Sequence, residues 1–388
     1  MWLSDLKIVE PNNVIERGSV RIENGLIAEI KSEPVLGGHE GDGLTLMPGF
    51  IDMHGDMIER ELEPRPRVSM PTEIAFRELD RRLAGAGVIT AYAAVSFTSG
   101  AADGQMRSFE HTGNVIRQLH AVRDQLRVDH RIHARFDITF DNALEVIRSL
   151  VEDDTLDLVS LMDHTPGQGQ YRNIEKHIDH VAHMRGVSRE EAQRHVERKI
   201  EDRKQPADVL ATTLHLISEL CHAADVTLAS HDDDTVEKVS LMHSLGVAIS
   251  EFPVDIVAAK GAHACGLANA MGAPNALRGQ SYSGNLSARE AHAAGVLDIL
   301  ASDYHPSSIL PAILILAKTD PDGLAGAVRL ATANPAKALG LTDRGVIEVG
   351  KRADLIIADT HSMGQVITSM RGGEVIYSNG VMQLGRAA

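Results

Sequence analysis

The sequence predicts an α/β fold, a (β/α)₈ barrel of the TIM type joined to a small β-sandwich domain built from both ends of the chain. Three observations predict it. The chain of 388 residues exceeds the usual size of a single domain. Its two ends read as short strands with tight turns, and its middle alternates brief apolar runs with amphipathic helical segments. With 43% hydrophobic and 24% charged residues, the composition is that of a globular protein.

The two ends of the chain share one sequence pattern, short apolar segments separated by tight turns. Near the start, Asn24-Gly25 separates two alternating apolar segments, which is a strong hairpin signal. Near the end of the chain, Gly372-Gly373 likewise lies at a predicted turn. We therefore predict a composite β-sandwich domain from residues 1–46 and 344–388.

The middle segment, residues 47–343, contains eight apolar runs that predict the barrel strands. They are 49–54, 87–96, 133–139, 156–164, 226–232, 247–253, 267–274 and 297–304. Between the fourth and fifth runs lies a long polar helical stretch, about 173–224, which we interpret as an insertion. Within it, Ser188 and Glu191 have the spacing of a helix capping box.

Charge and cysteine content limit the partners. A formal net charge of −16 argues against a nucleic-acid or anionic membrane surface, because the protein would repel a polyanion. The two cysteines cannot form a disulfide framework. The opening residues resemble no secretory or transit signal, and no apolar run reaches membrane-spanning length, so a cytoplasmic location is expected. We also expect a homo-oligomer, with the terminal strands mediating dimer contacts.

Polar residues gather where the predicted strands end, which is the active-site face of such a barrel. They are His54, Asp163, His164, His231, Asp232, Glu251 and Asp303. So many buried polar groups at one barrel mouth are costly unless a metal neutralises them. His54 and Asp56 are two positions apart at a strand end, so both side chains point to the same side and can bind a single ion. Imidazole and carboxylate ligands favour Zn²⁺, with Mn²⁺ or Mg²⁺ as alternatives.

Several of these segments carry a family resemblance. FIDMH (50–54), His231, Asp303 and TANPAKALGLTDRGVIEVGKRADLIIAD (332–359) together resemble the amidohydrolase superfamily. That resemblance implies a β-sandwich beside a distorted barrel holding one or two divalent ions. It also implies that His54, His231 and Asp303 take the ligand positions of strands one, five and eight.

The sequence departs from the superfamily pattern in an informative way. Asp56 stands where a second histidine is expected, Glu251 stands where a strand-six histidine is expected, and LDLVSLMDHT (156–165) has no lysine to carboxylate. We interpret Asp163, His164 and Glu251 as further candidate ligands. A carboxylate-rich shell is harder and more anionic, which suits substrates whose phosphate oxygens also bind the ion.

Three longer motifs indicate a narrower group within the superfamily. SLMDHTPGQGQ (160–170), MGAPNALRGQSYSGN (271–285) and DILASDYHPSSIL (298–310) resemble a branch of the superfamily that serves phosphonate utilisation. The resemblance implies a phosphorylated ribose phosphonate as substrate, loss of diphosphate from its 5-triphosphate, and the carbon–phosphorus lyase pathway proteins as partners. Tyr282 and Met57 depart from the branch's pattern, so the exact phosphonate stays open.

Because the protein is strongly acidic overall, a bound triphosphate needs positively charged side chains and amide donors in its immediate surroundings. We predict that Arg65, Arg67 and Arg278 bind phosphate, and Arg172 follows a glycine-rich stretch as a further candidate. Amide and hydroxyl groups would come from Gly167, Gln168, Gly279, Ser281, Ser283 and Asn285.

The mechanism we predict is metal-assisted hydrolysis, with Asp303 serving as ligand and as the base that accepts a proton from water. His164 is either a ligand of a second ion or the acid that assists departure of diphosphate. Two other functions remain open. One is an amidohydrolase that cleaves a C–N bond in an N-acetyl sugar phosphate or a cyclic amide, and the other is a non-catalytic scaffold.

Overall fold

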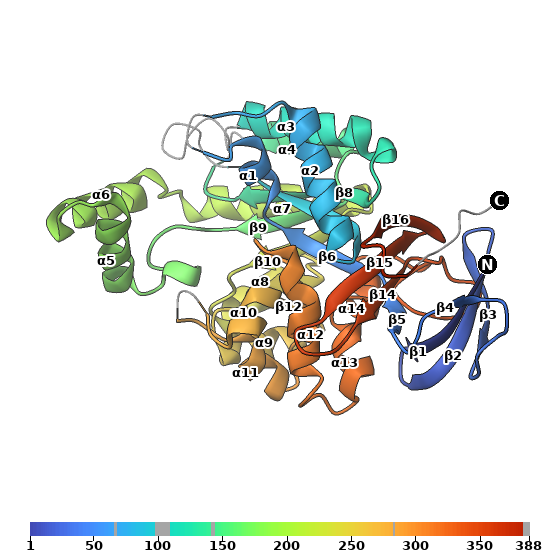
Figure 1. Ribbon diagram of the computed structural model, residues 1–388. Helices are drawn as coiled ribbons and strands as arrows, with labels where there is room; N and C mark the ends of the chain where they lie inside the picture. The colour runs from blue at the N-terminus through green and yellow to red at the C-terminus, as the bar shows by residue number, and fades with distance from the viewer. Residues whose placement is uncertain (66–67, 98–108, 141–143, 282–283, 383–388) are drawn as a thin grey trace.

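The computed structural model describes residues 1–65, 68–97, 109–140, 144–281 and 284–382, and it contains a parallel barrel beside a mainly antiparallel sheet (Figure 1). The predicted fold class is confirmed. The barrel strands follow one another in sequence order: β6 (Phe50–Gly55), β7 (Val88–Phe97), β8 (Asp129–Asp137), β9 (Leu158–Met162), β10 (Thr227–His231), β11 (Ile249–Glu251), β12 (Ala268–Gly272) and β13 (Ile299–Ala301). A parallel bridge between Gly55 and Asp303 brings the last strand back to the first.

Successive side chains of a barrel strand point alternately into the barrel and towards the surrounding helices. In β8, Ile132, Ala134 and Phe136 belong to the large core between strands and helices. The inward residues of the other strands form a separate cluster that fills the barrel: Ile51, Met53, Tyr92, Leu158, Ala229, Ile249, Ala270, Ile299 and Ala301, with Ala336 and Leu339 beneath. The barrel is thus packed below the level at which its polar residues begin.

The described parts of the chain contain fourteen α-helices, most of which pack around the barrel. They are α1 (Ile58–Leu62), α2 (Thr72–Gly85), α3 (Phe109–Val122), α4 (Leu144–Glu152), α5 (Ile174–Arg185), α6 (Arg189–Asp202), α7 (Ala207–Ala223), α8 (Val236–Ser244), α9 (Ile256–Ala264), α10 (Ala273–Arg278), α11 (Ala288–Ala293), α12 (Ile309–Leu316), α13 (Gly323–Arg329) and α14 (Ala333–Ala338). Among the helices described, none combines the length and the apolar character needed to span a lipid bilayer.

Strands from both ends of the chain form the second sheet. They are β1 (Trp2–Val9), β2 (Val14–Glu23), β3 (Leu26–Lys31), β4 (His39–Glu40), β5 (Thr45–Pro48), β14 (Leu355–Asp359), β15 (Gln365–Arg371) and β16 (Glu374–Ser378). Strand β5 joins the two ends, since it pairs with β1 on one side and β14 on the other. A core shared by the two ends holds this domain together; it includes Leu6, Val20, Leu46, Leu355 and Ile367.

Both predicted hairpin turns are present. Asn24 (φ 51°) and Gly25 (φ 78°) link β2 to β3, and Gly372 (φ 55°) and Gly373 (φ 78°) link β15 to β16. Positive φ at two successive residues is the requirement of the two-residue turn whose twist matches that of the strands.

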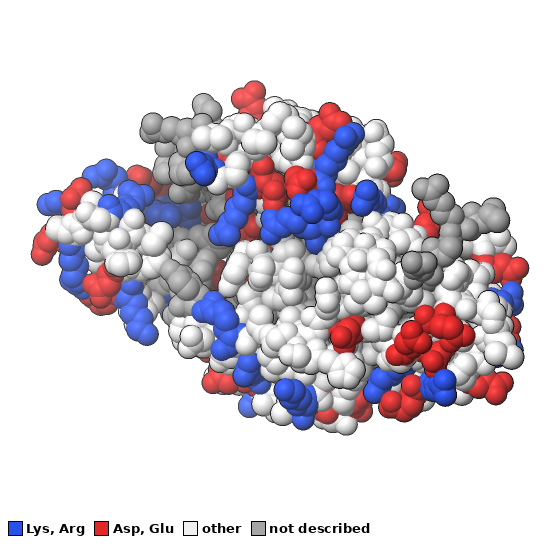
Figure 2. Space-filling model, viewed as in Figure 1, with Lys and Arg blue, Asp and Glu red and all other residues white. Residues whose placement is uncertain are grey.

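Helices α5 and α6 project from the barrel as an arm (Figure 1), and charged side chains of both signs cover it (Figure 2). The two helices pack on each other through Ile178, Ala192 and Val196. Ser188 accepts a hydrogen bond from the amide of Glu191 and begins α6, as its spacing predicts. Helix α7, by contrast, contacts β10 and α4 of the barrel. Of the predicted insertion, only α5 and α6 therefore stand away from the barrel.

A buried ion pair fastens the arm to the barrel. Nη1 of Arg203, just after α6, lies 3.2 Å from Oδ2 of Asp137 at the end of β8. Both side chains are buried. The carboxylate also accepts hydrogen bonds from the amide and hydroxyl of Thr139.

Candidate active site

A cavity of about 580 Å³ opens where the barrel strands end. Nine of the residues predicted from the sequence line it: His54, Asp56, His164, His231, Asp232, Arg278, Ser281, Asn285 and Asp303. The convergence that the sequence predicts is therefore present, and the cavity holds both acidic and basic groups.

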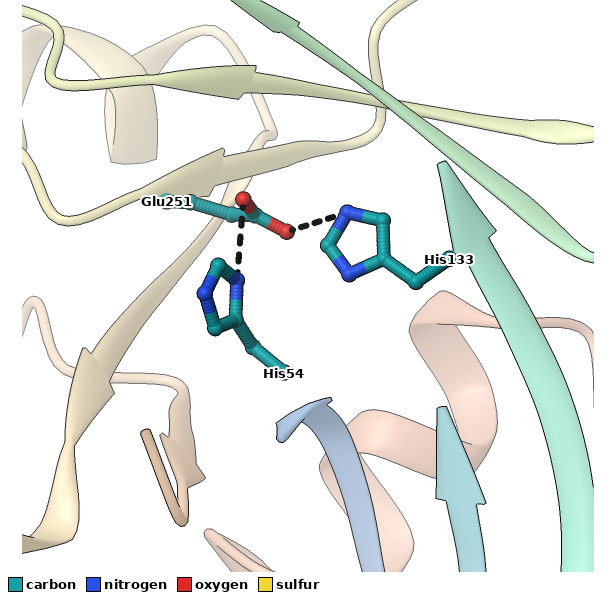
Figure 3. Close-up of side chains that lie close together, drawn as sticks. All are labelled: His54, His133 and Glu251. Carbon is teal, nitrogen blue, oxygen red and sulfur yellow. Dashed lines mark hydrogen bonds and ion pairs between the residues drawn. The ribbon is translucent and has the colours of Figure 1, made fainter. Parts of the chain in front are cut away.

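A triad of His54, His133 and Glu251 adjoins the cavity, and His54 is the member that lines it (Figure 3). Oε2 of Glu251 lies 3.3 Å from Nδ1 of His54, and Oε1 lies 3.4 Å from Nε2 of His133. All three side chains are buried. Nδ1 of His133 lies 3.1 Å from the carbonyl oxygen of Met53, which fixes the orientation of the ring.

His54 reaches the triad through an irregularity in its strand. Met53 belongs to the barrel-filling cluster, and strict alternation would turn the next side chain outward. The pairing of β6 with β7 is irregular between Asp52 and Gly55. This local break lets two consecutive side chains face the interior.

Glu251 is held as a carboxylate. Ser160 on β9 donates a hydrogen bond of 2.8 Å to Oε2. Burial alone would raise the pKa of Glu251, but the imidazoles of His133 and His54 hold it well below its usual range. Burial in turn lowers the pKa of His133 to about 3, so this ring is neutral at physiological pH. A neutral imidazole and an ionised carboxylate are the states in which these groups bind metals.

A second triad lies beside the first. Oδ2 of Asp232 is 3.0 Å from Nδ1 of His231 and 3.4 Å from Nε2 of His164. The rings of His231 and His54 are 5.8 Å apart, so the two triads are neighbours. Burial would raise the pKa of Asp232, but the two imidazoles hold it far below its usual range. Burial lowers the pKa of His231.

Three residues just after strand ends have left-handed backbones: Asp232 (φ 53°), Phe252 (φ 54°) and Asp303 (φ 55°). This conformation is tolerable for aspartate and strained for a bulky residue such as phenylalanine. The Phe252 ring packs edge-on against His54 at 4.9 Å and against His231 at 5.3 Å. The strained backbone thus places an apolar ring between the two triads.

Asp303 and Asp56 complete the acidic side of the cavity. The amide of Asp56 donates to the carbonyl of Asp303, and the amide of Asp303 donates to the carbonyl of His54, so the ends of β6 and β13 are locked together. Burial is the main cause that raises the pKa of Asp303, and the nearby charge of Asp56 adds to it. Oδ2 of Asp56 lies 3.4 Å from Nη1 of Arg135.

The remaining predicted residues lie around this centre. Asp163 accepts a hydrogen bond from the amide of Thr165. Arg172 pairs with Asp255 at 2.5 Å, away from the residues that line the cavity. Gly279 lines a neighbouring hollow together with Ser281 and Asn285.

The other predicted phosphate-binding residues lie further out. Gly167 and Gln168 form the turn before the 3₁₀ helix Gly169–Tyr171, whose Tyr171 does line the cavity. Arg65 is exposed beside Val68. Arg67 and Ser283 lie outside the described residues.

Sequence reasoning gave no role to His133, Arg60, Arg135, Phe252 or Tyr304. For two of them a signal exists. In HARFD (133–137), residues 133, 135 and 137 are polar and their neighbours are apolar, and alternation turns the polar set inward. Arg60 lies within α1 and lines the cavity, a position that no local spacing in the sequence predicts.

The two triads fit a divalent cation. In each, one nitrogen or oxygen from every residue lies within 4.8 Å of the others. Among the described residues, the buried atoms without a hydrogen-bond partner include Nε2 of His133, Oε1 of Glu251, Nδ1 of His231, Oδ2 of Asp232 and Nε2 of His164. Buried polar atoms without partners are expensive unless a ligand satisfies them. Imidazole and carboxylate donors suit Zn²⁺ or Mn²⁺.

Comparison with known proteins agrees with this geometry. The model of the amidohydrolase family matches residues 175–378. The α-D-ribose 1-methylphosphonate 5-triphosphate diphosphatase of Escherichia coli K12 is 36% identical over 364 residues, which cover 92% of this chain and 95% of that protein. The chain belongs to the amidohydrolase family. The resemblance predicted from the sequence is confirmed, and this amidohydrolase is a metal-dependent hydrolase.

Solved structures of other amidohydrolases share the fold. 5-Methylcytosine deaminase from Klebsiella pneumoniae superposes with a TM-score of 0.65 at 15% identity, and 99% of each chain is covered. Dihydropyrimidinase from Brevibacillus agri superposes with a TM-score of 0.57 at 14% identity, covering 97% of this chain and 95% of that one. At these identities the likeness concerns the fold of the amidohydrolase and not its substrate.

Proposed function

We propose that this amidohydrolase is a diphosphatase of phosphonate utilisation, which converts α-D-ribose 1-methylphosphonate 5-triphosphate to the 5-phosphate and diphosphate. The observation that carries the proposal is the 36% identity to the E. coli diphosphatase over 92% of this chain.

The charge of the cavity supports a phosphorylated substrate. Three arginines, Arg60, Arg135 and Arg278, line a cavity in a protein whose formal net charge is −16. Guanidinium groups bind phosphate oxygens through paired N–H donors. Nη1 of Arg278 also lies 3.2 Å from the hydroxyl oxygen of Tyr304, which orients the guanidinium at the cavity wall.

The metal-binding residues of this mechanism would be His54, His133 and Glu251, with Asp56, His231 and Asp303 beside them. A bound divalent ion supplies charge neutralisation and lowers the pKa of water. Asp303 accepts the proton of the attacking water, and its raised pKa makes it a better base than an exposed aspartate.

Two further residues act on the leaving group. Arg278 holds phosphate oxygens, because phosphoryl transfer depends mainly on position and charge stabilisation. His164 donates a proton as diphosphate departs. Oδ2 of Asp232 lies 3.4 Å from Nε2 of His164 and helps to hold the imidazole in the cavity.

Cleavage of a C–N bond is the competing function. Its support is the structural likeness to the deaminase and the dihydropyrimidinase. At sequence identities of 15% and 14%, that likeness shows a shared fold and no more. The products separate the two functions, since one reaction yields diphosphate and the other ammonia or an acid. A homo-oligomeric state and contacts with carbon–phosphorus lyase proteins remain predictions.

The test is phosphorus NMR of the purified protein, loaded with Zn²⁺ or Mn²⁺, during incubation with α-D-ribose 1-methylphosphonate 5-triphosphate. We expect a diphosphate signal to grow while the phosphonate signal is retained. A folded, metal-loaded protein that leaves the spectrum unchanged would contradict the proposal, and N-acetyl sugar phosphates and cyclic amides would then be assayed.

A further inference from the structure

Arg135 projects from β8 into the catalytic cavity and lies between Asp56 and His231. Its side chain is 8% exposed. Nη1 lies 3.4 Å from Oδ2 of Asp56, and Nη2 lies 3.5 Å from Nε2 of His231. A buried cation thus sits against residues from two different strand ends.

The hydrogen-bonding capacity of this guanidinium is largely unused. Within the described part of the chain, Nε and Nη1 of Arg135 have no hydrogen-bond partner. Arg344, equally buried, offers the contrast, because it donates to Thr90, Asp129 and Asp343. Arginine has five donors, and a buried one is normally satisfied. Apart from the ion pair of Nη1 with Asp56, these donors can still bind the acceptor oxygens of a molecule that enters the cavity.

The location of this charge also bears on the number of metal ions. The first triad, His54, His133 and Glu251, can hold an ion by itself. In the second triad, Nε2 of His231 faces the guanidinium of Arg135. That fixed positive charge lowers the affinity of the second triad for a divalent ion relative to the first triad, because like charges repel strongly in a buried site of low dielectric constant.

We propose that Arg135 is a catalytic residue that contacts the non-bridging oxygens of the transferred phosphoryl group, and that its charge takes the place of a second metal ion. The site then works with one ion per chain. As water attacks, a P–O bond forms to the water oxygen, the P–O bond to diphosphate breaks, and the water proton passes to Asp303. Arg135 exchanges no proton and stabilises the negative charge on the equatorial oxygens. This inference rests on the proposed diphosphatase function.

The experiment compares the wild-type protein with Arg135→Gln and Arg135→Lys, and with Arg117→Gln as the control. Arg117 is an exposed arginine of α3 that contacts Ser149 and lies outside the catalytic cavity. Three quantities are measured: metal ions per chain by mass spectrometry after dialysis, the affinity of the metal-loaded protein for inorganic diphosphate by calorimetry, and kcat. Circular dichroism establishes that each variant is folded.

We expect one ion per chain in the wild type and the control. Arg135→Gln should weaken diphosphate binding about 10- to 100-fold, because a charged hydrogen bond is lost, and lower kcat about 10³-fold. Arg135→Lys should bind diphosphate more tightly than Arg135→Gln and less tightly than the wild type. Lysine keeps the positive charge but lacks the paired N–H donors of the guanidinium. If Arg135→Gln does not fold, Arg135→Lys alone should still show weaker diphosphate binding.

Two ions per chain in the wild type, or wild-type diphosphate affinity in the folded Arg135 variants, would overturn the inference. Ion content and diphosphate binding need no turnover, so they separate this inference from the proposed function. If the ribose triphosphate is not cleaved but Arg135→Gln loses diphosphate affinity, the substrate assignment is wrong and the anion-binding role of Arg135 stands.

Discussion

The carboxylate of Glu251 lies between the imidazole rings of His54 and His133, 3.3 Å from one and 3.4 Å from the other. These residues come from β11, β6 and β8, far apart in sequence. A hydrogen bond from Ser160 fixes the rotation of the carboxylate. We therefore expect metal binding to depend more on Glu251 than on any other residue of this triad.

Glu251→Gln should reduce metal affinity more than Ser160→Ala does, because the amide loses the negative charge while the alanine variant loses only an orienting hydrogen bond. For Ser160→Ala we expect a loss of about 10- to 100-fold. Metal-binding titrations with a competing chelator measure both. Equal affinities for the wild type and Glu251→Gln would exclude the first triad as a metal site.

The metal-free protein should lose stability as pH falls from about 6.5 towards 3. The pKa of His133 is lowered by burial from 6.5 to about 3, so the unfolded chain takes up a proton in this range and the folded chain does not. The stability from a neutral His133 is therefore complete above pH 6.5 and declines at up to about 1.4 kcal/mol per pH unit below it.

Urea unfolding of the chelator-treated protein at several pH values measures this slope. His133→Asn serves as the comparison, because it keeps a polar side chain that does not titrate. Its slope between pH 6.5 and 4.5 should be shallower than that of the wild type. Parallel slopes would mean that His133 is not a neutral buried group.

Asp303→Asn should retain the fold and lose turnover by at least about 10²- to 10⁴-fold, because the amide cannot accept the proton of water. Its backbone contacts with Asp56 and His54 do not involve the side chain, so the barrel closure is preserved. Diphosphate release and circular dichroism measure the two properties. A folded variant with near wild-type turnover would remove Asp303 from the role of base.

Arg278→Ala should raise KM about tenfold or more, because a charge-assisted contact to phosphate is lost. Tyr304→Phe removes only the hydroxyl that contacts the guanidinium, so its KM should lie between that of the wild type and that of Arg278→Ala. Steady-state kinetics compare both with Arg117→Ala, a surface variant. A KM for Arg278→Ala equal to that of Arg117→Ala would place Arg278 outside the substrate site.

Arg203→Ala should destabilise the protein by about 3–5 kcal/mol, because it leaves the carboxylate of Asp137 buried without its ionic partner. The double variant Asp137→Ala/Arg203→Ala should lose less than the sum of the two single variants. Urea unfolding measures all four proteins. Strictly additive losses would show that the pair does not fasten the arm.

Local pattern determined a large part of this protein. Apolar runs of strand length predict all eight barrel strands, and two turn pairs, Asn24-Gly25 and Gly372-Gly373, predict the hairpins of the terminal sheet. The polar residues at strand ends predict the cavity, because parallel strands of a barrel end on one face. His54, His231 and Asp303 follow from that rule, and the structure brings them together.

Tertiary structure alone decided which polar groups meet. An irregular pairing at the end of β6 turns His54 inward beside Met53, and the sequence carries no mark of it. His133 joins Glu251 only because β8 and β11 face each other across the barrel, a relationship set by closure and stagger and not by local spacing. The same closure brings Arg135 between Asp56 and His231. Local periodicity fixes the face on which a side chain stands, whereas only the closed barrel fixes what stands opposite it.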